Sequence, residues 1–158
     1  MNLSEIKTLV EDKVLDTIIT YHEATGFELP IPNIRFTKKG VVAGTATYEI
    51  NDININLKMF IDNKEGMLSR TIPHEVGHLI AFKQYKSRGH SPVWKGVMRT
   101  LGVSATRCHN YNMTNVVEQF TFKCDCKPHR LSKIIRNKIR RGQRRYCKTC
   151  KQLLFEVK

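Results

Sequence analysis

The stretch IPHEVGHLIAF, residues 72–82, decides the fold of this chain, because it places two histidines four residues apart on one predicted helix. Its apolar side chains recur at helical spacing, which predicts a half-buried helix within residues 63–85. Residues four apart project from the same face of a helix, so both imidazoles point the same way. Pro73 lacks an amide hydrogen and either kinks this helix or opens its second part, and the sequence leaves both possibilities open.

His74, Glu75 and His78 form an HExxH motif, whose spacing suits a zinc ion held by the two imidazoles at about 2.0 to 2.1 Å. Glu75 lies beside the first histidine, where it can accept a proton from water without filling a coordination position. We therefore expect Glu75 to be the general base of a hydrolytic site. The chemistry that this motif predicts is hydrolysis of an amide bond.

A catalytic zinc needs a third protein ligand and one open position. His90 is the first choice, because it ends a basic loop that can return the chain to the helix of His74 and His78. His109 is the second choice and His22 the third. His109 and Tyr111 are candidates for stabilising the oxyanion of the reaction. The predicted strand at residues 43–48 offers either an edge for an added substrate strand or an ordinary half-buried strand.

The remaining pattern predicts an α+β domain around this motif. A helix is expected over residues 4–23, with Ser4 as its cap and its end near Gly26, and another helix begins at Ser91 and Pro92. Runs of branched and aromatic residues predict strands. These strands cover residues 34–37, 41–49, 53–59 and 116–122, with a hairpin turn at residues 51–52.

Composition excludes several classes of protein. The chain has 158 residues, 41% of them hydrophobic, and no window approaches the roughly 18 consecutive apolar residues of a membrane span. The first residues lack the pattern of a secretory signal, so we expect a cytoplasmic protein without disulfides. Five cysteines, four of them after residue 123, fit metal ligation better than a disulfide framework. The fifth, Cys108, is expected to be a small buried side chain.

A second metal site is predicted in the last 38 residues. Cys147 and Cys150 form a CxxC pair, and Cys124, Cys126 and His129 lie about 20 residues earlier. Four of these five side chains predict a structural zinc in a ribbon, since so short and charged a segment has little apolar mass of its own. The sequence does not decide which of Cys124 and Cys126 is a ligand.

The charge of the chain is concentrated in its second part. Residues 1–90 have no net charge, whereas residues 91–158 carry all of the formal net charge of +13. A basic surface held by a metal site predicts binding to the phosphate backbone of nucleic acid, largely independent of base sequence and weakened by salt. The residues expected to contact nucleic acid are Lys133, Arg136, Lys138, Arg140, Arg141, Arg144, Arg145 and Lys148.

The chain resembles the SprT/Spartan-like metalloproteases, and the likeness is closest to bacterial SprT proteins. The resemblance rests on five stretches that span nearly the whole chain. They are Lys39-Gly40-Val41-Val42-Ala43-Gly44-Thr45-Ala46, Pro73-His74-Glu75-Val76-Gly77-His78, Gly89-His90-Ser91-Pro92-Val93-Trp94, Leu101-Gly102-Val103 with His109 after it, and the cysteine clusters Cys124-Asp125-Cys126-Lys127-Pro128-His129 and Arg144-Arg145-Tyr146-Cys147-Lys148-Thr149-Cys150.

The resemblance implies a zincin-like metalloprotease domain at residues 1–120 and a basic zinc ribbon at residues 121–158. It implies one catalytic zinc on His74, His78 and His90, Glu75 as the catalytic residue, and one structural zinc. It further implies an endopeptidase that cleaves proteins bound or crosslinked to DNA and is activated by single-stranded or distorted DNA, in the cytoplasm and near the nucleoid. The alternative is a non-catalytic nucleic-acid-binding zinc protein whose histidine site is structural.

Overall fold

The computed structural model describes residues 1–107 and 109–157 and has mixed α and β structure. The chain divides into two compact units, Met1–Met113 and Thr114–Lys158. The sequence placed this boundary near residue 120. The structure assigns the preceding residues to the second unit, because the strand β4 (Gln119–Lys123) pairs with strands of that unit. The prediction for Cys108 falls outside the described residues.

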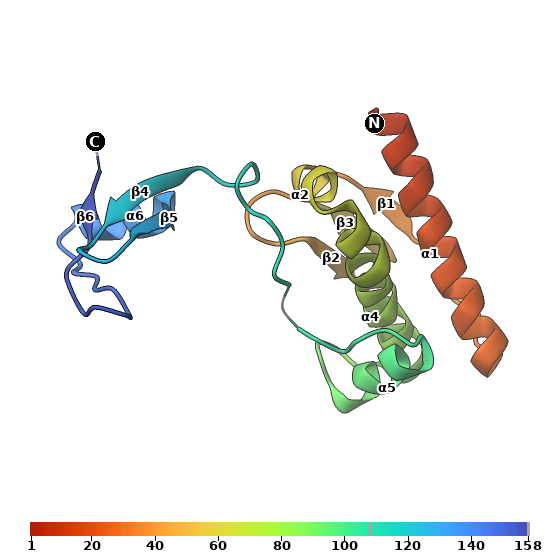
Figure 1. Ribbon diagram of the computed structural model, residues 1–158. Helices are drawn as coiled ribbons and strands as arrows, with labels where there is room; N and C mark the ends of the chain where they lie inside the picture. The colour runs from red at the N-terminus through yellow and green to blue at the C-terminus, as the bar shows by residue number, and fades with distance from the viewer. Residues whose placement is uncertain (108, 158) are drawn as a thin grey trace. The chain divides into compact units, whose positions relative to one another are not determined.

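The first unit begins with the long helix α1 (Leu3–Thr25). Asn2, and not the predicted Ser4, is its N-cap: the Asn2 side chain accepts a hydrogen bond from the Glu5 amide, and the Glu5 carboxylate accepts one from the Asn2 amide. Gly26 ends the helix in a left-handed conformation with φ 74°. One face of α1 is buried, and the helix packs against α4 (Ile72–Tyr85) and α5 (Pro92–Thr100), as Figure 1 shows.

A three-stranded sheet lies next to the helices, with the strand order β1-β3-β2. The central strand β3 (Asp52–Ile55) pairs in parallel with β1 (Asn33–Arg35) and antiparallel with β2 (Gly44–Thr47). β2 is therefore an edge strand of this sheet. The turn before β3 covers residues 48–51, slightly earlier than predicted, and Asn51 adopts the left-handed conformation with φ 50°.

Asparagine side chains make the strands shorter than the sequence predicted. The side-chain oxygen of Asn54 accepts hydrogen bonds from the amides of Thr37 and Lys38, which ends the pairing of β1. The side chain of Asn56 caps the helix α2 (Leu57–Asp62) by accepting a hydrogen bond from the Met59 amide. Residues 57–59, predicted as strand, therefore begin a helix.

The segment between α2 and α4 is helical except at Asn63, where the backbone bends, and it changes its helical geometry. A single turn α3 (Lys64–Gly66) is followed by the π-helix η1 (Met67–Thr71), after which α4 begins. Pro73 occupies the first turn of α4, where its missing amide hydrogen breaks no helical bond. Of the two possibilities left open by the sequence, the proline opens the helix. Ser91 caps α5 through a hydrogen bond from the Trp94 amide.

The second unit contains a three-stranded antiparallel sheet with the order β5-β4-β6 and one short helix. Its elements are β4, β5 (Pro128–Ser132), α6 (Lys133–Arg140) and β6 (Phe155–Glu156). Its fully buried apolar core consists of Phe122, Cys147 and Leu154. Among the described residues, no helix is long and apolar enough to cross a lipid bilayer.

Candidate functional site

Three imidazoles converge in the first unit. His74 and His78 lie one turn apart on α4, and His90 comes from the loop between α4 and α5. Nε2 of His74 lies 3.1 Å from Nε2 of His78 and 3.0 Å from Nε2 of His90. One ligand atom from each side chain lies within 4.8 Å of the other two. The structure thus brings the first of the three proposed third ligands to the helix-borne pair.

The other two histidines considered as ligands lie elsewhere. His22 is in the last turn of α1, where its Nδ1 lies 3.3 Å from the carbonyl oxygen of Phe27. His109 lines the same cleft as the three imidazoles but stacks on Tyr111, with 4.3 Å between the ring centroids. Neither side chain belongs to the group of three.

The donor set fits a zinc ion. Two nitrogens bound tetrahedrally to one zinc at about 2.0 to 2.1 Å lie about 3.3 Å apart, close to the observed separations. Zinc binds the neutral form of imidazole. Burial, together with the neighbouring imidazoles, lowers the pKa of His74 to about 4 and that of His78 to about 3. Both side chains are therefore neutral and ready to coordinate near pH 7.

Trp94 contacts all three imidazoles, stacking on His78 and meeting His74 and His90 edge-on. Its ring is fully buried on α5, and its centroid lies 4.7 Å from that of His74, 5.1 Å from that of His78 and 4.6 Å from that of His90. This ring fixes the orientations of side chains from two segments at once. The sequence identified Trp94 only as an apolar residue of a helix, because its position against the imidazoles depends on how α5 packs against α4.

Glu75 lies on α4 against the strand β2, with only 7% of its surface exposed. Gly44 makes this contact possible, since a Cβ at that position would lie 3.1 Å from Cγ of Glu75. Burial raises the pKa of Glu75 to about 7, although a hydrogen bond with the backbone of Ala46 and the charge of Lys38 act in the opposite direction. A carboxyl group with this pKa can both accept and release a proton near neutral pH.

A cleft of about 660 Å³ contains the three histidines and Glu75. Residues 41–46, which include most of β2, form one part of its lining, and another part consists of Ser104, Thr106, Arg107, His109 and Tyr111. β2 is thus a half-buried edge strand that contributes to the lining of the cleft, and whether it pairs with a substrate strand stays a prediction. The cleft has the size of sites that bind small molecules or short peptide segments.

Tyr111 and His109, the two candidates for oxyanion stabilisation, both line this cleft. The hydroxyl of Tyr111 lies 2.9 Å from Oγ1 of Thr71, at the end of the π-helix. Its ring fits closely over Gly66, where a Cβ would come within 2.5 Å of the tyrosine ring. Arg70 and Thr71 also line the cleft, and no local sequence signal marked the π-helix that carries them.

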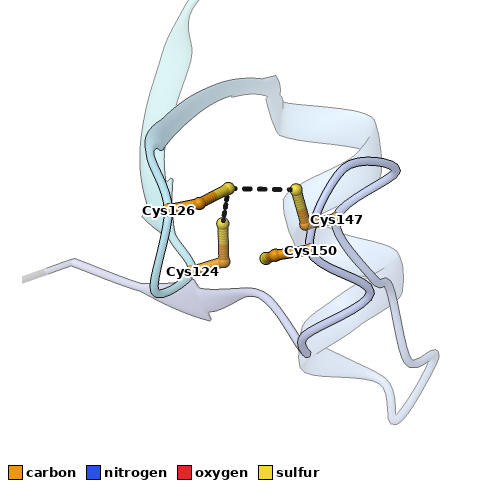
Figure 2. A group of neighbouring side chains, drawn as sticks. All are labelled: Cys124, Cys126, Cys147 and Cys150. Carbon is orange, nitrogen blue, oxygen red and sulfur yellow. Dashed lines mark hydrogen bonds between the residues drawn. The ribbon is translucent and has the colours of Figure 1, made fainter.

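Four cysteines form a second candidate metal site in the second unit. Cys124, Cys126, Cys147 and Cys150 place one sulfur each within 4.8 Å of the others, and Figure 2 shows the four side chains turned toward a shared centre. Sγ of Cys126 lies 3.4 Å from that of Cys124 and 3.7 Å from that of Cys147. Both early cysteines belong to the group. His129 does not, although its Nε2 lies 3.2 Å from Sγ of Cys124.

The pKa values of two thiols in this group are shifted in opposite directions. A backbone hydrogen bond from Cys150 lowers the pKa of Cys147 to about 5, whereas contacts with the thiols of Cys124 and Cys150 raise the pKa of Cys126 to about 12. Four thiolates at this separation repel one another, and a bound divalent cation removes that repulsion. The donor chemistry of this group therefore fits zinc.

The predicted nucleic-acid contacts divide into two sets. Arg136 is half-buried, stacks over Phe120 at 3.8 Å and forms an ion pair with Glu156, which Arg140 also contacts. Lys133 lies 3.3 Å from Glu118. These three cations are partly engaged within the second unit. The others, Lys138, Arg141, Arg144, Arg145 and Lys148, are exposed.

Comparison with known proteins identifies the family. The model of the SprT-like family matches residues 15–115. Protein SprT of Vibrio parahaemolyticus is 34% identical over 154 residues, covering 95% of this chain and 93% of that protein. The chain belongs to the SprT-like family. The proteins named Protein SprT from Proteus mirabilis and Escherichia coli are 33% and 32% identical, over 83% and 82% of this chain and 81% of each relative.

The two comparisons cover different lengths of the chain. The SprT-like family model covers the histidine group and extends two residues past the end of the first unit, whereas the four cysteines lie beyond it. The alignment with the Vibrio parahaemolyticus protein covers almost the whole chain. No solved structure matches the chain significantly.

Proposed function

We propose that this SprT-like protein is a zinc-dependent endopeptidase that acts on proteins bound or crosslinked to DNA in the bacterial cytoplasm. The observation that carries the proposal is the convergence of His74, His78 and His90 in a cleft beside the buried Glu75. Three imidazole ligands would leave one position of a bound zinc open, as in catalytic zinc sites and unlike closed structural ones.

Each group in the cleft has a role in amide hydrolysis. His74, His78 and His90 would hold the zinc, which when bound acidifies water and polarises a carbonyl group. Glu75 would accept a proton from the attacking water and donate it to the nitrogen that leaves, as its pKa of about 7 permits. The Tyr111 hydroxyl, which borders the cleft, would donate a hydrogen bond to the developing oxyanion.

The strand β2 would position the substrate. As an edge strand beside the cleft, it has backbone groups that can pair with an extended segment of another protein. Recognition through the backbone requires little of the substrate side chains. Such an enzyme would accept many proteins and would depend on a second site for its choice of target.

The second unit would provide that second site. Its exposed cations, which lie near Tyr146 in the sequence, favour binding to a phosphate backbone. The cysteine group would hold a structural zinc that stabilises the unit. Binding to DNA would raise the local concentration of any protein attached to the same DNA. Arg144 and Arg145 are the cations best suited to a test, since neither takes part in an ion pair within the described residues.

The first experiment separates catalysis from metal binding. Glu75→Gln should keep the zinc content of the protein and lower the cleavage rate by about 100-fold or more, because the general base is lost. The matched control is Glu65→Gln on the exposed turn α3, which should cleave normally. The measurement is cleavage of a protein crosslinked to single-stranded DNA, together with the zinc content. Undiminished cleavage by Glu75→Gln would contradict the proposal.

The same assay tests the role of DNA. The double variant Arg144→Ala, Arg145→Ala should cleave the DNA-linked protein more slowly at 150 mM salt but cleave an unattached peptide at the wild-type rate, since two phosphate contacts are lost. If the double variant cleaved both substrates at the wild-type rates, the protein would be a peptidase unrelated to DNA. Two bound zinc ions without turnover under any DNA condition would favour the non-catalytic binding protein instead.

A further inference from the structure

The third histidine depends on a loop for its position. His74 and His78 are fixed relative to each other by one helix, whereas His90 lies in residues 86–91, between α4 and α5. This loop contains two residues in the left-handed conformation, Lys86 with φ 55° and Gly89 with φ 62°. An unsupported loop would hold a ligand poorly, because binding would then require the loop to become ordered.

The turn after β2 provides the support. The amide of Gly89 donates a hydrogen bond to the hydroxyl of Tyr48 at 3.1 Å, one residue before His90. The guanidinium of Arg88 forms an ion pair with Glu49 at 2.6 Å and lies 5.1 Å from the centre of the Tyr48 ring. We call Tyr48 and Glu49, with their partners Arg88 and Gly89, the hairpin clamp.

Tyr48 also contacts the helix that carries the other two ligands. Its ring packs on Phe82 with 4.9 Å between centroids, and it meets His78 edge-on at 6.4 Å. One side chain therefore touches α4 through its ring and the loop of His90 through its hydroxyl. Tyr48 therefore links the two segments that carry the ligands, in addition to the contacts that Trp94 makes with all three imidazoles.

We propose that Tyr48 is a positioning residue for the histidine site, whose hydroxyl holds His90 beside His74 and so slows the loss of the metal. The inference rests on the proposed zinc site but not on peptidase activity. Within the clamp, the hydroxyl should matter most: Arg88 and Glu49 are each 58% exposed, so solvent screens their ion pair, whereas the hydrogen bond acts directly next to the ligand.

The test is the rate of zinc release to a chromogenic chelator from the full chain. The phase that belongs to the histidine site is the one that His90→Ala abolishes. Tyr48→Phe removes only the hydroxyl and should accelerate this phase about five-fold, the effect expected for one lost hydrogen bond. Glu49→Gln should change it less than about two-fold. Tyr85→Phe, which removes a hydroxyl paired with Tyr21, is the matched control and should behave as the wild type.

A positioning role differs measurably from a general structural one. The release phase of the cysteine site and the melting temperature of the metal-free protein should be the same for Tyr48→Phe and the wild type. Unchanged zinc release from the histidine site would overturn the proposal. It would also be overturned if the metal-free variant were destabilised enough to explain the faster release. If the wild-type protein showed no peptide cleavage at all, only the proposed function would be contradicted, because zinc release is measured without substrate.

Discussion

At the scale of single residues, two glycines on neighbouring helices have opposite surroundings. A Cβ at Gly77 on α4 would lie 2.7 Å from Sδ of Met98 and 3.4 Å from Nε1 of Trp94, the ring that contacts the three imidazoles. A Cβ at Gly96 on α5 would meet nothing within 4 Å. The first glycine is required by close packing, while the second only lowers the stability of its helix.

Alanine at these two positions should therefore change stability in opposite directions. Gly77→Ala should destabilise the first unit by about 1 kcal/mol, because overpacking outweighs the gain in helix propensity. Gly96→Ala should stabilise it by about 0.5 to 1 kcal/mol. Denaturant unfolding of both variants gives the comparison. A Gly77→Ala protein more stable than the wild type would show that Met98 moves aside without cost.

The sequence identifies residues well where one element fixes them. His74 and His78 follow from helical spacing alone, and Glu75 follows from its place between them. His90 required a choice among three histidines, because a loop has no period from which its path can be read. The roles of Tyr48 and Trp94 could not be predicted, since both depend on contacts between elements that are distant in sequence.

At the scale of elements, the sheet of the first unit depends on one buried carboxylate. Asp52 at the start of β3 is 1% exposed in its side chain and accepts hydrogen bonds from Arg35 at 2.7 and 2.8 Å and from Asn33 at 2.8 Å, both on β1. The hydrogen bonds from Arg35, together with that from Asn33, hold the pKa of Asp52 below its usual value, against the effect of burial. The hydrogen bonds of this carboxylate connect β3 to its parallel neighbour β1.

The pH dependence of this contact has a defined sign. Because the pKa of Asp52 is lower in the folded state, its stabilisation is complete above the unfolded pKa of about 3.9 and is lost as the pH falls through the folded pKa. Asp52→Asn should lower the melting temperature by about 5 °C at pH 7. The difference from the wild type should shrink below about pH 4.

The control for this prediction is Asp16→Asn on α1. The carboxylate of Asp16 is 62% exposed and pairs with Lys13 at 2.6 Å, so its removal should shift the melting temperature little at any pH. Thermal unfolding between pH 3 and pH 8 gives the comparison. A difference between Asp52→Asn and the wild type that stays constant down to pH 3 would contradict the assigned role of the charge.

Elements were predicted by type more reliably than by extent. The first helix was expected at residues 4–23 and occupies Leu3–Thr25. The prediction was close because the apolar spacing of a helix repeats over many residues of this segment. The strands were shorter than expected, since the side chains of Asn54 and Asn56 end them by hydrogen bonding to backbone amides. The elements β5 and α6 were not predicted, because the charged residues between their apolar residues obscure the periodic pattern.

At the scale of the whole molecule, the two units differ in what stabilises them. The first unit buries a continuous set of large apolar side chains from its helices and sheet, whereas the core of the second consists of Phe122, Cys147 and Leu154 with a few partly buried neighbours. So small an apolar core is marginal for a unit of 45 residues. We expect the cysteine group to supply the rest through its metal.

Removing the metals should therefore unfold one unit selectively. A chelator that strips both sites should abolish the dispersed amide signals of residues 114–157 and leave most signals of the first unit dispersed. Nuclear magnetic resonance of the full chain makes this visible residue by residue. Re-addition of zinc is the control and should restore the spectrum. A second unit that stays folded with chelator would show that its apolar core suffices.

Under the proposed function, the position of β2 beside the cleft has a consequence for which proteins would be degraded. This strand lines a cleft of about 660 Å³, a volume that holds a few residues of a single extended chain. A compact domain already uses its backbone groups internally and is too wide to enter. Stable native proteins nearby would be spared, and degradation would begin at a tail, a loosened loop or a denatured stretch.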